Sequence, residues 1–401
     1  MRSTARLLVA LAIAGCAGQP QVGPRTKAAP RESARAAQRP PPGRSQDTRW
    51  AAAPDDCDLE APALNDITPL RFESCGSAPF PCLRADADWA ASSGWGFGGL
   101  LSSRESDDGE VELSFSRAIA PRVWESVVQR GDEVIFALRA RVPESRCMIG
   151  GPHLSPEGAA VVVRRAAMMA EPWVFTGATP ERVLASPRVL PFTVTSEDVA
   201  TLGPSSVALH RSNGLVLRNL EDERWISHPL NRPVWAADGT LWAEGSRTHF
   251  GTLYQVDGAH AGALPPPPGG RLRLRLTAGG PFVAWIEATP TEDLARFEDR
   301  TLVVLRAGSS DEVRRIAIGP GTASPMVVGE HNTVLRLSDQ ELLVVDLESG
   351  RQSTLEAPTE LAWAGGRSPI ALAGGVLWAR AAHAGRAAND GRALFRFELT
   401  P

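Results

Sequence analysis

Three arginines in one short stretch have the spacing of a binding surface. Arg271, Arg273 and Arg275 alternate with leucines, and in a β-strand this alternation puts the three guanidinium groups on one face. Guanidinium groups form paired hydrogen bonds with carboxylates and phosphates, so the stretch indicates a site for an anionic group. A row of charges also protects the edge strand of a sheet from unwanted pairing. We favour a solvated edge strand and keep the anion site as the alternative.

The N-terminus has the pattern of an export signal. Arg2 and Arg6 precede the apolar run Leu7–Ala14, which is too short to span a bilayer. The run ends in Ile13-Ala14-Gly15-Cys16, which resembles the lipobox of bacterial lipoproteins. The resemblance implies that residues 1–15 are a signal peptide and that Cys16 is acylated and anchors the chain to a membrane. An ordinary signal peptide is the alternative. Ala17, rather than Asp, follows the cysteine, and by the lipoprotein sorting rule this favours the outer membrane over the inner.

Residues 16–49 are rich in Pro, Ala and Arg and nearly free of large apolar side chains. Such a segment buries too little surface to fold, so we expect a disordered tether. Its arginines either lie on an anionic membrane or wall polymer or are simply solvated, and we favour the second. The formal net charge of the chain is −4, and the basic excess lies before Trp50. The acidic remainder argues against a nucleic-acid partner, because such binding depends on phosphate neutralisation.

The four cysteines after Cys16 are Cys57, Cys75, Cys82 and Cys147. An even number in an exported protein predicts two disulfides, for which three pairings are possible. We favour Cys75–Cys82, which closes a short loop, together with Cys57–Cys147. Zinc is the alternative, but the close ligand pairs of structural zinc sites are absent. We therefore predict no metal.

Other motifs have simpler explanations than chemistry. Gly94–Gly99 contains the G-x-G-x-x-G spacing, but no periodic helix follows as a dinucleotide site requires. Asp107–Glu110 could hold calcium, yet it fits a hairpin turn better. The histidines lack the spacing of a zinc protease, and no nucleophile elbow is present. The sequence thus predicts no cofactor and favours a binding protein over an enzyme. Carboxylates that converge from distant segments would leave no local motif.

The clearest structural unit is the stretch from Pro325 to Pro358. Short apolar runs separated by Gly, Asn, Asp and Ser are typical of an antiparallel meander. Four strands are expected there, at Val327–Val328, Thr333–Leu337, Leu342–Leu347 and Gln352–Leu355. Such a small sheet must stack on others like itself to bury its faces.

The same pattern of short strands separated by turns recurs along the chain. Units begin near residues 152, 196, 233, 280, 325 and 360, and a further sheet is expected upstream, at Val111–Ser116, Val123–Val128 and Val134–Arg141. A spacing of roughly 35–47 residues is that of four-stranded propeller blades. We therefore predict an all-β fold, with residues 50–401 forming a β-propeller of about seven blades (six or eight are possible). Most tryptophans should pack between blades.

The segment Pro152–Gly158, followed by Ala159–Val163, resembles the blade opening of TolB-type, WD40-like propellers. Pro233–Gly239 resembles a degraded second copy, and Asp346–Gly350 resembles the blade-closing turn of that family. The resemblance implies a periplasmic propeller that binds another protein. The lipoprotein propeller of the outer-membrane barrel assembly machinery is a second analogue, although its tryptophan pattern is not evident here.

These observations lead to three functional hypotheses. The first is a monomeric, lipid-anchored propeller of the cell envelope that binds or scaffolds a protein. The second is a carbohydrate-active enzyme with carboxylates at the propeller channel, and the third is a sensor of small anionic ligands that uses the arginine strand. Carboxylates and aromatic side chains gathered at the channel would favour the enzyme. A broad apolar face would favour the scaffold.

Overall fold

The computed structural model describes 19 segments, all of which belong to one compact unit, residues 42–401. They are residues 58–77, 81–85, 101–106, 108–120, 123–141, 147–149, 153–155, 157–165, 169–175, 181–182, 199–211, 214–220, 225–292, 296–309, 312–322, 326–358, 361–363, 370–383 and 393–399. The expected signal peptide and tether, Cys16, Cys57 and the Gly94–Gly99 motif lie outside the described residues.

Seven antiparallel sheets make up the described part of the chain, and we call them blades 1–7. Blade 1 contains β4 (Ser102–Glu105), β5 (Val111–Ala120), β6 (Val123–Arg130), β7 (Glu133–Arg141) and β1 (Asp58–Glu60). Blade 2 contains β8 (Cys147–Ile149), β9 (His153–Ser155), β10 (Gly158–Arg165), β11 (Met169–Phe175) and β12 (Glu181–Arg182). Blade 3 contains β13 (Val199–Leu202), β14 (Ser206–Arg211), β15 (Gly214–Asn219) and β16 (Trp225–His228).

The later blades follow the same plan. Blade 4 contains β17 (Leu230–Trp235), β18 (Leu241–Gly245), β19 (Leu253–Asp257) and β20 (His260–Ala263). Blade 5 contains β21 (Leu272–Gly279), β22 (Phe282–Pro290), β23 (Phe297–Arg306) and β24 (Glu312–Ala317). Blade 6 contains β25 (Met326–Val328), β26 (Asn332–Arg336), β27 (Glu341–Asp346) and β28 (Gln352–Glu356). Blade 7 contains β29 (Leu361–Trp363), β30 (Ile370–Ala373), β31 (Val376–His383), β32 (Ala393–Glu398), β3 (Pro81–Ala85) and β2 (Phe72–Ser77).

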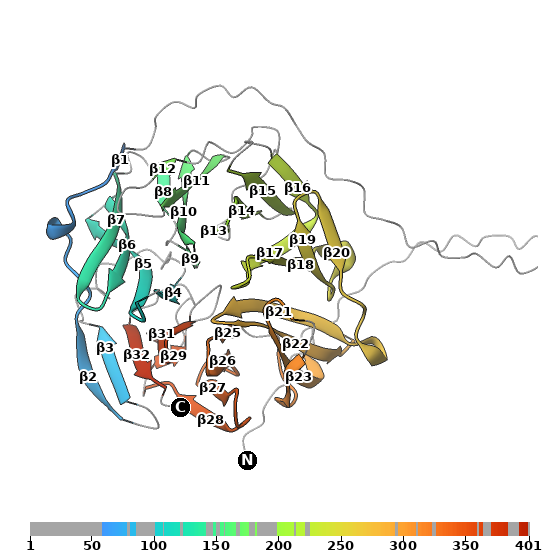
Figure 1. Cartoon of the computed structure of the whole chain (residues 1–401). Helices are drawn as coiled ribbons and strands as arrows, with labels where there is room; N and C mark the ends of the chain where they lie inside the picture. Colours follow the sequence, from blue (N-terminus) through green and yellow to red (C-terminus); the bar gives the residue numbers. More distant parts are fainter. Residues whose placement is uncertain are drawn as a thin grey trace, which may run out of the picture. The chain divides into compact units, whose positions relative to one another are not determined.

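The innermost strands of the seven blades form a closed ring. In chain order β4, β9, β13, β17, β21, β25 and β30 each contact the next, and β30 contacts β4 again. Figure 1 shows the blades arranged in this circle. The structure is therefore the all-β propeller that the spacing of the repeats predicts.

No α-helix occurs in the described segments, which contain only the short 3-10 turns η1 (Leu64–Asp66), η4 (Arg247–His249) and η5 (Pro268–Gly270). None of the described helices is long and apolar enough to cross a membrane.

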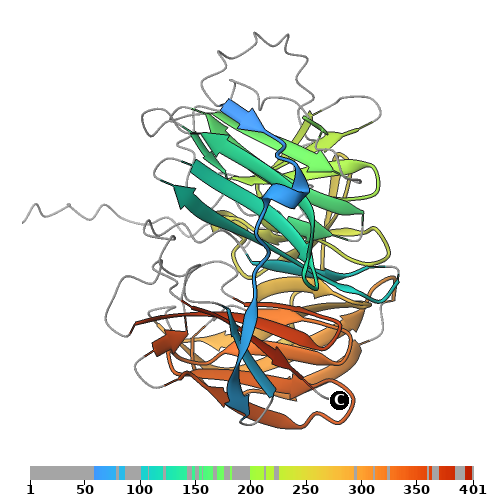
Figure 2. The same cartoon turned by 90° about the vertical axis from the view of Figure 1, so that its left-hand side faces the viewer.

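The N-terminal part of the domain joins the first blade to the last. β1 pairs with β7 at the outer edge of blade 1. After η1 the chain crosses to blade 7, where β3 pairs with the C-terminal strand β32 and β2 completes the sheet. Figure 2 shows this segment running in blue from blade 1 to blade 7. Between the two blades, Gln129 donates to the backbone oxygen of Leu70 (2.9 Å) and accepts from its N–H (2.7 Å).

The hydrophobic core lies between neighbouring blades. One cluster joins blades 5 and 6, another blades 6 and 7, a third blades 7 and 1, and two more join blade 4 to blades 3 and 5. Trp242 of blade 4 stacks on Trp285 of blade 5, with ring centroids 6.3 Å apart. Trp363 meets Phe395 and Phe397 edge-on within blade 7. The expected packing of tryptophans between blades is confirmed for Trp242 and Trp285.

Blade 6 matches its prediction closely, since its four strands differ from the expected ranges by about one residue at most ends. The turn after β27 forms because the Asp346 carboxylate accepts from the Ser349 N–H (2.6 Å) and Gly350 adopts φ +74°. The strands of blade 1 are likewise confirmed. Blade 5 differs: it begins at β21 (272–279), rather than near residue 280, because the arginine stretch is its innermost strand.

Candidate ligand-binding channel

The ring encloses a cavity of about 700 Å³. Every blade contributes to its wall, mostly through the innermost strand and the loop that follows it. The charged and imidazole side chains on the wall are Arg104, Glu105, Asp108, Glu112, Arg130, His153, His210, Arg232, Arg275 and Glu330.

The arginines of blade 1 are held by acidic partners. Glu112 is completely buried and accepts from Arg104 Nε (2.7 Å) and from Arg130 Nη2 (2.6 Å). Arg130 also pairs with Asp108 (3.2 Å). The hydrogen bond that Arg130 donates to Glu112 raises the pKa of Arg130 above its ordinary value, although burial opposes the shift. Arg104 spans to blade 2 by donating to the Ser155 oxygen (2.7 Å). This side of the channel is thus internally neutralised.

Arg232 and Arg275 have an unusual backbone. Their φ angles are +47° and +60°, and they are the only non-glycine residues with positive φ in the described segments. Both lie at register shifts in innermost strands, Arg232 in β17 and Arg275 in β21. A bulge re-aims a side chain, and left-handed backbone is costly for a residue with a Cβ. Blades 4 and 5 therefore each have a bulge with a positive-φ arginine on the wall of the same cavity.

Glu244 links these two bulges. Its Oε1 lies 3.5 Å from Arg232 Nη1 and accepts a hydrogen bond of 2.7 Å from the N–H of Leu276, the residue after Arg275. Glu244 lies on β18, pairs across the ladder with Asn231, and is not itself part of the cavity wall.

His153 lies on the wall in β9. Burial lowers its pKa to about 4, so its imidazole is neutral near pH 7. Its Nδ1 is buried with no hydrogen-bond partner among the described residues. An imidazole of this kind can accept or donate a hydrogen bond to a bound molecule.

Trp235 gives the channel a fixed aromatic side chain. Its Nε1 donates to the Thr201 oxygen of blade 3 (3.3 Å), and its ring packs over Gly203. A Cβ at Gly203 would lie 2.3 Å from the ring, so only glycine fits there.

The three arginines singled out by sequence have different surroundings. Arg271 donates to the backbone oxygens of Glu287 (2.9 Å) and Asp299 (3.1 Å) and to the side-chain hydroxyl of Thr301 (2.9 Å). Arg273 pairs with the Glu287 carboxylate (3.1 Å). Arg275 alone reaches the cavity wall. The regular alternation is broken by the bulge between Leu274 and Thr277. The strand is an edge strand of its sheet, as expected, but it is the innermost strand of its blade and only partly exposed.

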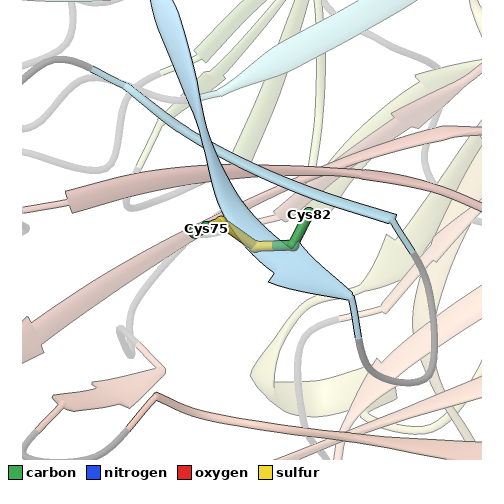
Figure 3. Close-up of a disulfide and its surroundings, with 2 residues drawn as sticks. All are labelled: Cys75 and Cys82. Atoms are coloured by element: carbon green, nitrogen blue, oxygen red, sulfur yellow. A yellow bond between two sulfur atoms is a disulfide. The ribbon is translucent and has the colours of Figure 1, made fainter.

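The disulfide between Cys75 and Cys82 is present, as predicted (Figure 3). It joins β2 to β3 in the hairpin that closes blade 7. The second predicted disulfide, Cys57–Cys147, is not tested, because Cys57 lies outside the described residues. Asp107 lies outside the described residues, but residues 108–110 form part of the turn between β4 and β5, where the Gly109 N–H donates to the backbone oxygen of Ser106 (2.9 Å), as the turn interpretation expects.

Sequence reasoning missed Arg232, Glu244 and His153 as site residues. One signal was available for the first: Pro233 follows Arg232, and a proline in or at the start of a strand indicates a strand start, an edge strand or a bulge. Nothing local marks Glu244, whose partners belong to another part of the chain.

The chain matches no protein-family model and no curated protein. Among solved structures it is similar to an oligogalacturonate lyase in complex with manganese, with a TM-score of 0.54 at 13% identity over 83% of this chain and 97% of that chain. A second oligogalacturonate lyase, from Vibrio parahaemolyticus, has a TM-score of 0.53 at 11% identity over 86% and 98% of the two chains. The β-propeller domain of the Trilobed protease from Pyrococcus furiosus has a TM-score of 0.46 at 11% identity, covering 76% of this chain and 97% of that chain.

The described segments contain no group of three or more His, Cys, Asp or Glu side chains that could hold a metal ion. The propeller fold that the resemblance to TolB-type repeats implied is present, and no family model matches the chain. At these identities, the comparisons establish that the chain has a β-propeller fold.

Proposed function

We propose that the protein is a receptor whose channel binds a small anionic molecule at Arg232 and Arg275. The observation that carries the proposal is the pair of positive-φ arginines, from neighbouring blades, on the wall of one cavity. Strained non-glycine backbone concentrates at functional sites, where the strain is offset by the surrounding structure. Guanidinium groups suit carboxylate or phosphate oxygens.

The size and charge of the channel support a small polar ligand. A volume of about 700 Å³ lies within the usual range for small-molecule sites. Glu105 and Glu330, on blades 1 and 6, put negative charge on other parts of the wall. A ligand with an anionic group at one end and hydroxyl or ammonium groups at the other complements this distribution. Trp235 offers it an aromatic surface.

Isothermal titration with anionic probes tests the proposal. The probes are glucuronate, citrate, phenyl phosphate, benzenesulfonate and oligogalacturonate, the last because two propellers of similar fold are oligogalacturonate lyases. We expect at least one probe to bind and the variants R232Q and R275Q to weaken it tenfold or more, as for loss of a charge-assisted hydrogen bond.

The matched control is R396Q. Arg396 has the same side-chain exposure as Arg232, 33%, and a similar single ion pair, 3.4 Å to Glu398, but it is not part of the cavity wall. We expect R396Q to bind like the wild type. Absence of binding by every probe, or equal losses in all three variants, would refute the proposal.

Enzymatic activity on carbohydrate is the second candidate. Glu105, Glu330 and Trp235 line one channel, which is the combination of carboxylates and an aromatic side chain that favoured the enzyme over the scaffold. Incubation with oligogalacturonate and separation of the products decides it. Turnover that is lost in E105Q or E330Q would establish an enzyme, whereas binding without turnover supports the receptor.

The protein-scaffold hypothesis lacks the expected apolar face in the described segments. The large hydrophobic side chains exposed there are Ile119, Leu220 and Phe250, which belong to different blades or follow them. Protein binding therefore has no specific surface to support it in this part of the chain.

We also propose that the receptor is lipid-anchored in the cell envelope. The apolar run Leu7–Ala14 and the motif ending in Cys16 support this. Cys16→Ser should move the protein from the membrane to the soluble fraction, whereas membrane retention of the variant would count against acylation.

A further inference from the structure

Three neutral polar side chains on the channel wall each have a buried atom with no hydrogen-bond partner among the residues that the structure describes. The atoms are Ser103 Oγ, His153 Nδ1 and Thr201 Oγ1, and all three residues line the cavity. Thr201 is only 1% exposed. Most buried polar groups in folded proteins are bonded, and leaving one without a partner is costly. Three such groups on one wall therefore indicate a place where a bound molecule supplies the partners.

The three residues lie on successive blades. Their strands β4, β9 and β13 belong to the innermost ring of blades 1, 2 and 3, and β9 contacts both of the others. Side chains of β4 hold β9 in place: Ser102 Oγ accepts from the Leu154 N–H (3.0 Å), and Arg104 donates to the backbone oxygen of Ser155 (2.7 Å). The polar groups are thus presented by one continuous and well-bonded arc of the wall.

The chemistry of this arc suits a neutral polar group. Serine and threonine hydroxyls both donate and accept hydrogen bonds, and a neutral imidazole has one nitrogen of each kind. Burial lowers the pKa of His153, so its imidazole is neutral near pH 7. The charged side chains of blade 1 are already paired, since Arg104 and Arg130 both bond to Glu112. A ligand hydroxyl, which can donate and accept, satisfies such groups without adding charge.

Trp235 connects this arc to the proposed anion site. Its Nε1 donates to the backbone oxygen of Thr201 (3.3 Å), and it lines the cavity together with Arg232, which lies on the same strand, β17. Its ring gives the body of a ligand a flat aromatic surface. The channel therefore has hydroxyl-binding groups on blades 1–3, an aromatic surface next to them and arginines on blades 4 and 5.

We propose that Ser103, His153 and Thr201 form a subsite for hydroxyl groups, so that the channel selects a hydroxylated acid over the same acid without hydroxyls. This inference rests on the proposed function, because it names the class of anion that the same channel takes. Binding requires rotation of side chains only, since all three residues already line the cavity.

Matched pairs of probes test the selectivity. Citrate and tricarballylate differ by one hydroxyl. Glucuronate and tetrahydropyran-2-carboxylate share a ring and a carboxylate, but only glucuronate has hydroxyls on the ring. Titration calorimetry at pH 7 measures the four affinities, and the ratio within each pair reports recognition of the hydroxyls separately from recognition of the anionic group.

The variants remove one polar group at a time. Ser103→Ala and Thr201→Val remove a hydroxyl, His153→Phe removes the ring nitrogens, and Thr201→Ser keeps the hydroxyl. Thr333→Val is the matched control. Thr333 Oγ1, on β26, is also buried with no partner in the described part of the chain, but Thr333 is not part of the cavity wall.

We expect wild type to bind the hydroxylated member of at least one pair about tenfold or more tightly than its counterpart. S103A, H153F and T201V should each lower that ratio about fivefold, as for loss of one hydrogen bond between neutral groups. T201S and T333V should keep the ratio of wild type.

Stability without ligand is the second measurement. Denaturant unfolding of T201V should show a midpoint equal to or above that of wild type, because the substitution removes a polar group without a partner. T333V should behave in the same way. Weaker binding without weaker folding distinguishes a hydroxyl that serves the ligand from one that serves the fold.

The inference is overturned if wild type binds both members of each pair equally, or if none of the three variants lowers the ratio. A clear loss of stability in T201V would also overturn it, because the hydroxyl would then be bonded inside the protein. These results leave the proposed function intact, provided that R232Q and R275Q still lose binding of an anionic probe. If wild type binds no anionic probe, the proposed function fails and this inference fails with it.

Discussion

Arg232 and Arg275 show how a single backbone angle can indicate a site. Left-handed backbone costs a residue with a Cβ about 1–2 kcal/mol, and nothing in a propeller blade requires arginine at such a position. Glycine would satisfy the bulge at lower cost. The proposed function gives a reason for these side chains, with the backbone strain as the cost of directing them toward the channel.

Comparing glycine and alanine variants measures this strain. Arg232→Gly and Arg232→Ala both remove the side chain, but only glycine relaxes at φ +47°. We expect the glycine variant to have a free energy of unfolding about 1 kcal/mol higher than the alanine variant. At Arg396, in the regular strand β32, the order should reverse. Denaturant unfolding measures both pairs, and an alanine advantage at residue 232 would contradict the strain.

His153 makes stability depend on pH. Its pKa of about 4 in the folded protein lies below the ordinary 6.5, so between these values the unfolded chain binds a proton that the folded chain does not. The free energy of unfolding should therefore fall as the pH drops from 6.5 toward 4, by about 2 kcal/mol from this residue. His228, whose pKa is also lowered by burial, contributes in the same direction.

Chemical denaturation at pH 7 and pH 4.5 tests the role of His153. The variant His153→Gln should lose about 2 kcal/mol less than wild type between the two pH values. Equal losses in the two proteins would mean that His153 titrates normally. Because the variant is compared with wild type, the titration of other groups cancels.

Within a blade, strands are joined by buried ion pairs as well as by apolar contacts. Glu287 on β22 is 1% exposed and accepts from Arg273 on β21 (3.1 Å) and Arg315 on β24 (2.9 Å). Burial acts to raise its pKa, but the hydrogen bonds from the two guanidinium groups outweigh this and lower the pKa below its ordinary value. In blade 1, Glu125 is held in the same way by Arg117 and Arg139.

Removing such a carboxylate leaves two guanidinium groups without their main partner. Glu287→Ala should cost about 3–5 kcal/mol of unfolding free energy. Glu398→Ala, at a half-exposed pair in blade 7, should cost less than about 1 kcal/mol. Thermal unfolding compares the two variants. A small loss in Glu287→Ala would show that the buried pair adds little to blade 5.

At the scale of the molecule, stability depends on how the ring closes. Blade 7 combines the C-terminal strands with β3 and β2 from the N-terminal side, and the Cys75–Cys82 disulfide joins those two strands. An open ring would expose the cluster between blades 7 and 1, which includes Trp378 and Leu394. The β2–β3 hairpin therefore helps to keep the hydrophobic cluster between blades 7 and 1 away from water, in addition to its own buried surface.

Reduction of the disulfide should weaken this closure. The short loop that it closes corresponds to about 2 kcal/mol of stabilisation. We expect reductant to lower the unfolding free energy by about that amount and to increase hydrogen exchange first in β3 and β32. The double variant Cys75→Ser/Cys82→Ser should behave like the reduced protein and not respond to reductant. Unchanged exchange in blade 7 would contradict the role of the hairpin.

The sequence by itself determined the repeating unit and its turns. Blade 6 and the turns at Asp238–Gly239 and Asp346–Gly350 depend on strand patterns and turn residues that interact within a few positions. The Cys75–Cys82 pairing was foreseeable for the same reason, because a short loop brings the two residues together. Turn hydrogen bonds, strand patterns and a short disulfide loop involve residues only a few positions apart, so these features can be predicted from neighbouring residues in the sequence.

Only the tertiary structure decided which residues share the channel and how the ring closes. Glu244 meets Leu276 across a separation of 32 residues, and β3 pairs with β32 from the opposite end of the domain. The alternation of Arg271, Arg273 and Arg275 suggested one face, but the bulge sent Arg275 alone to the cavity wall. Contacts of this kind are set by the closure of seven blades, whose geometry no local pattern specifies.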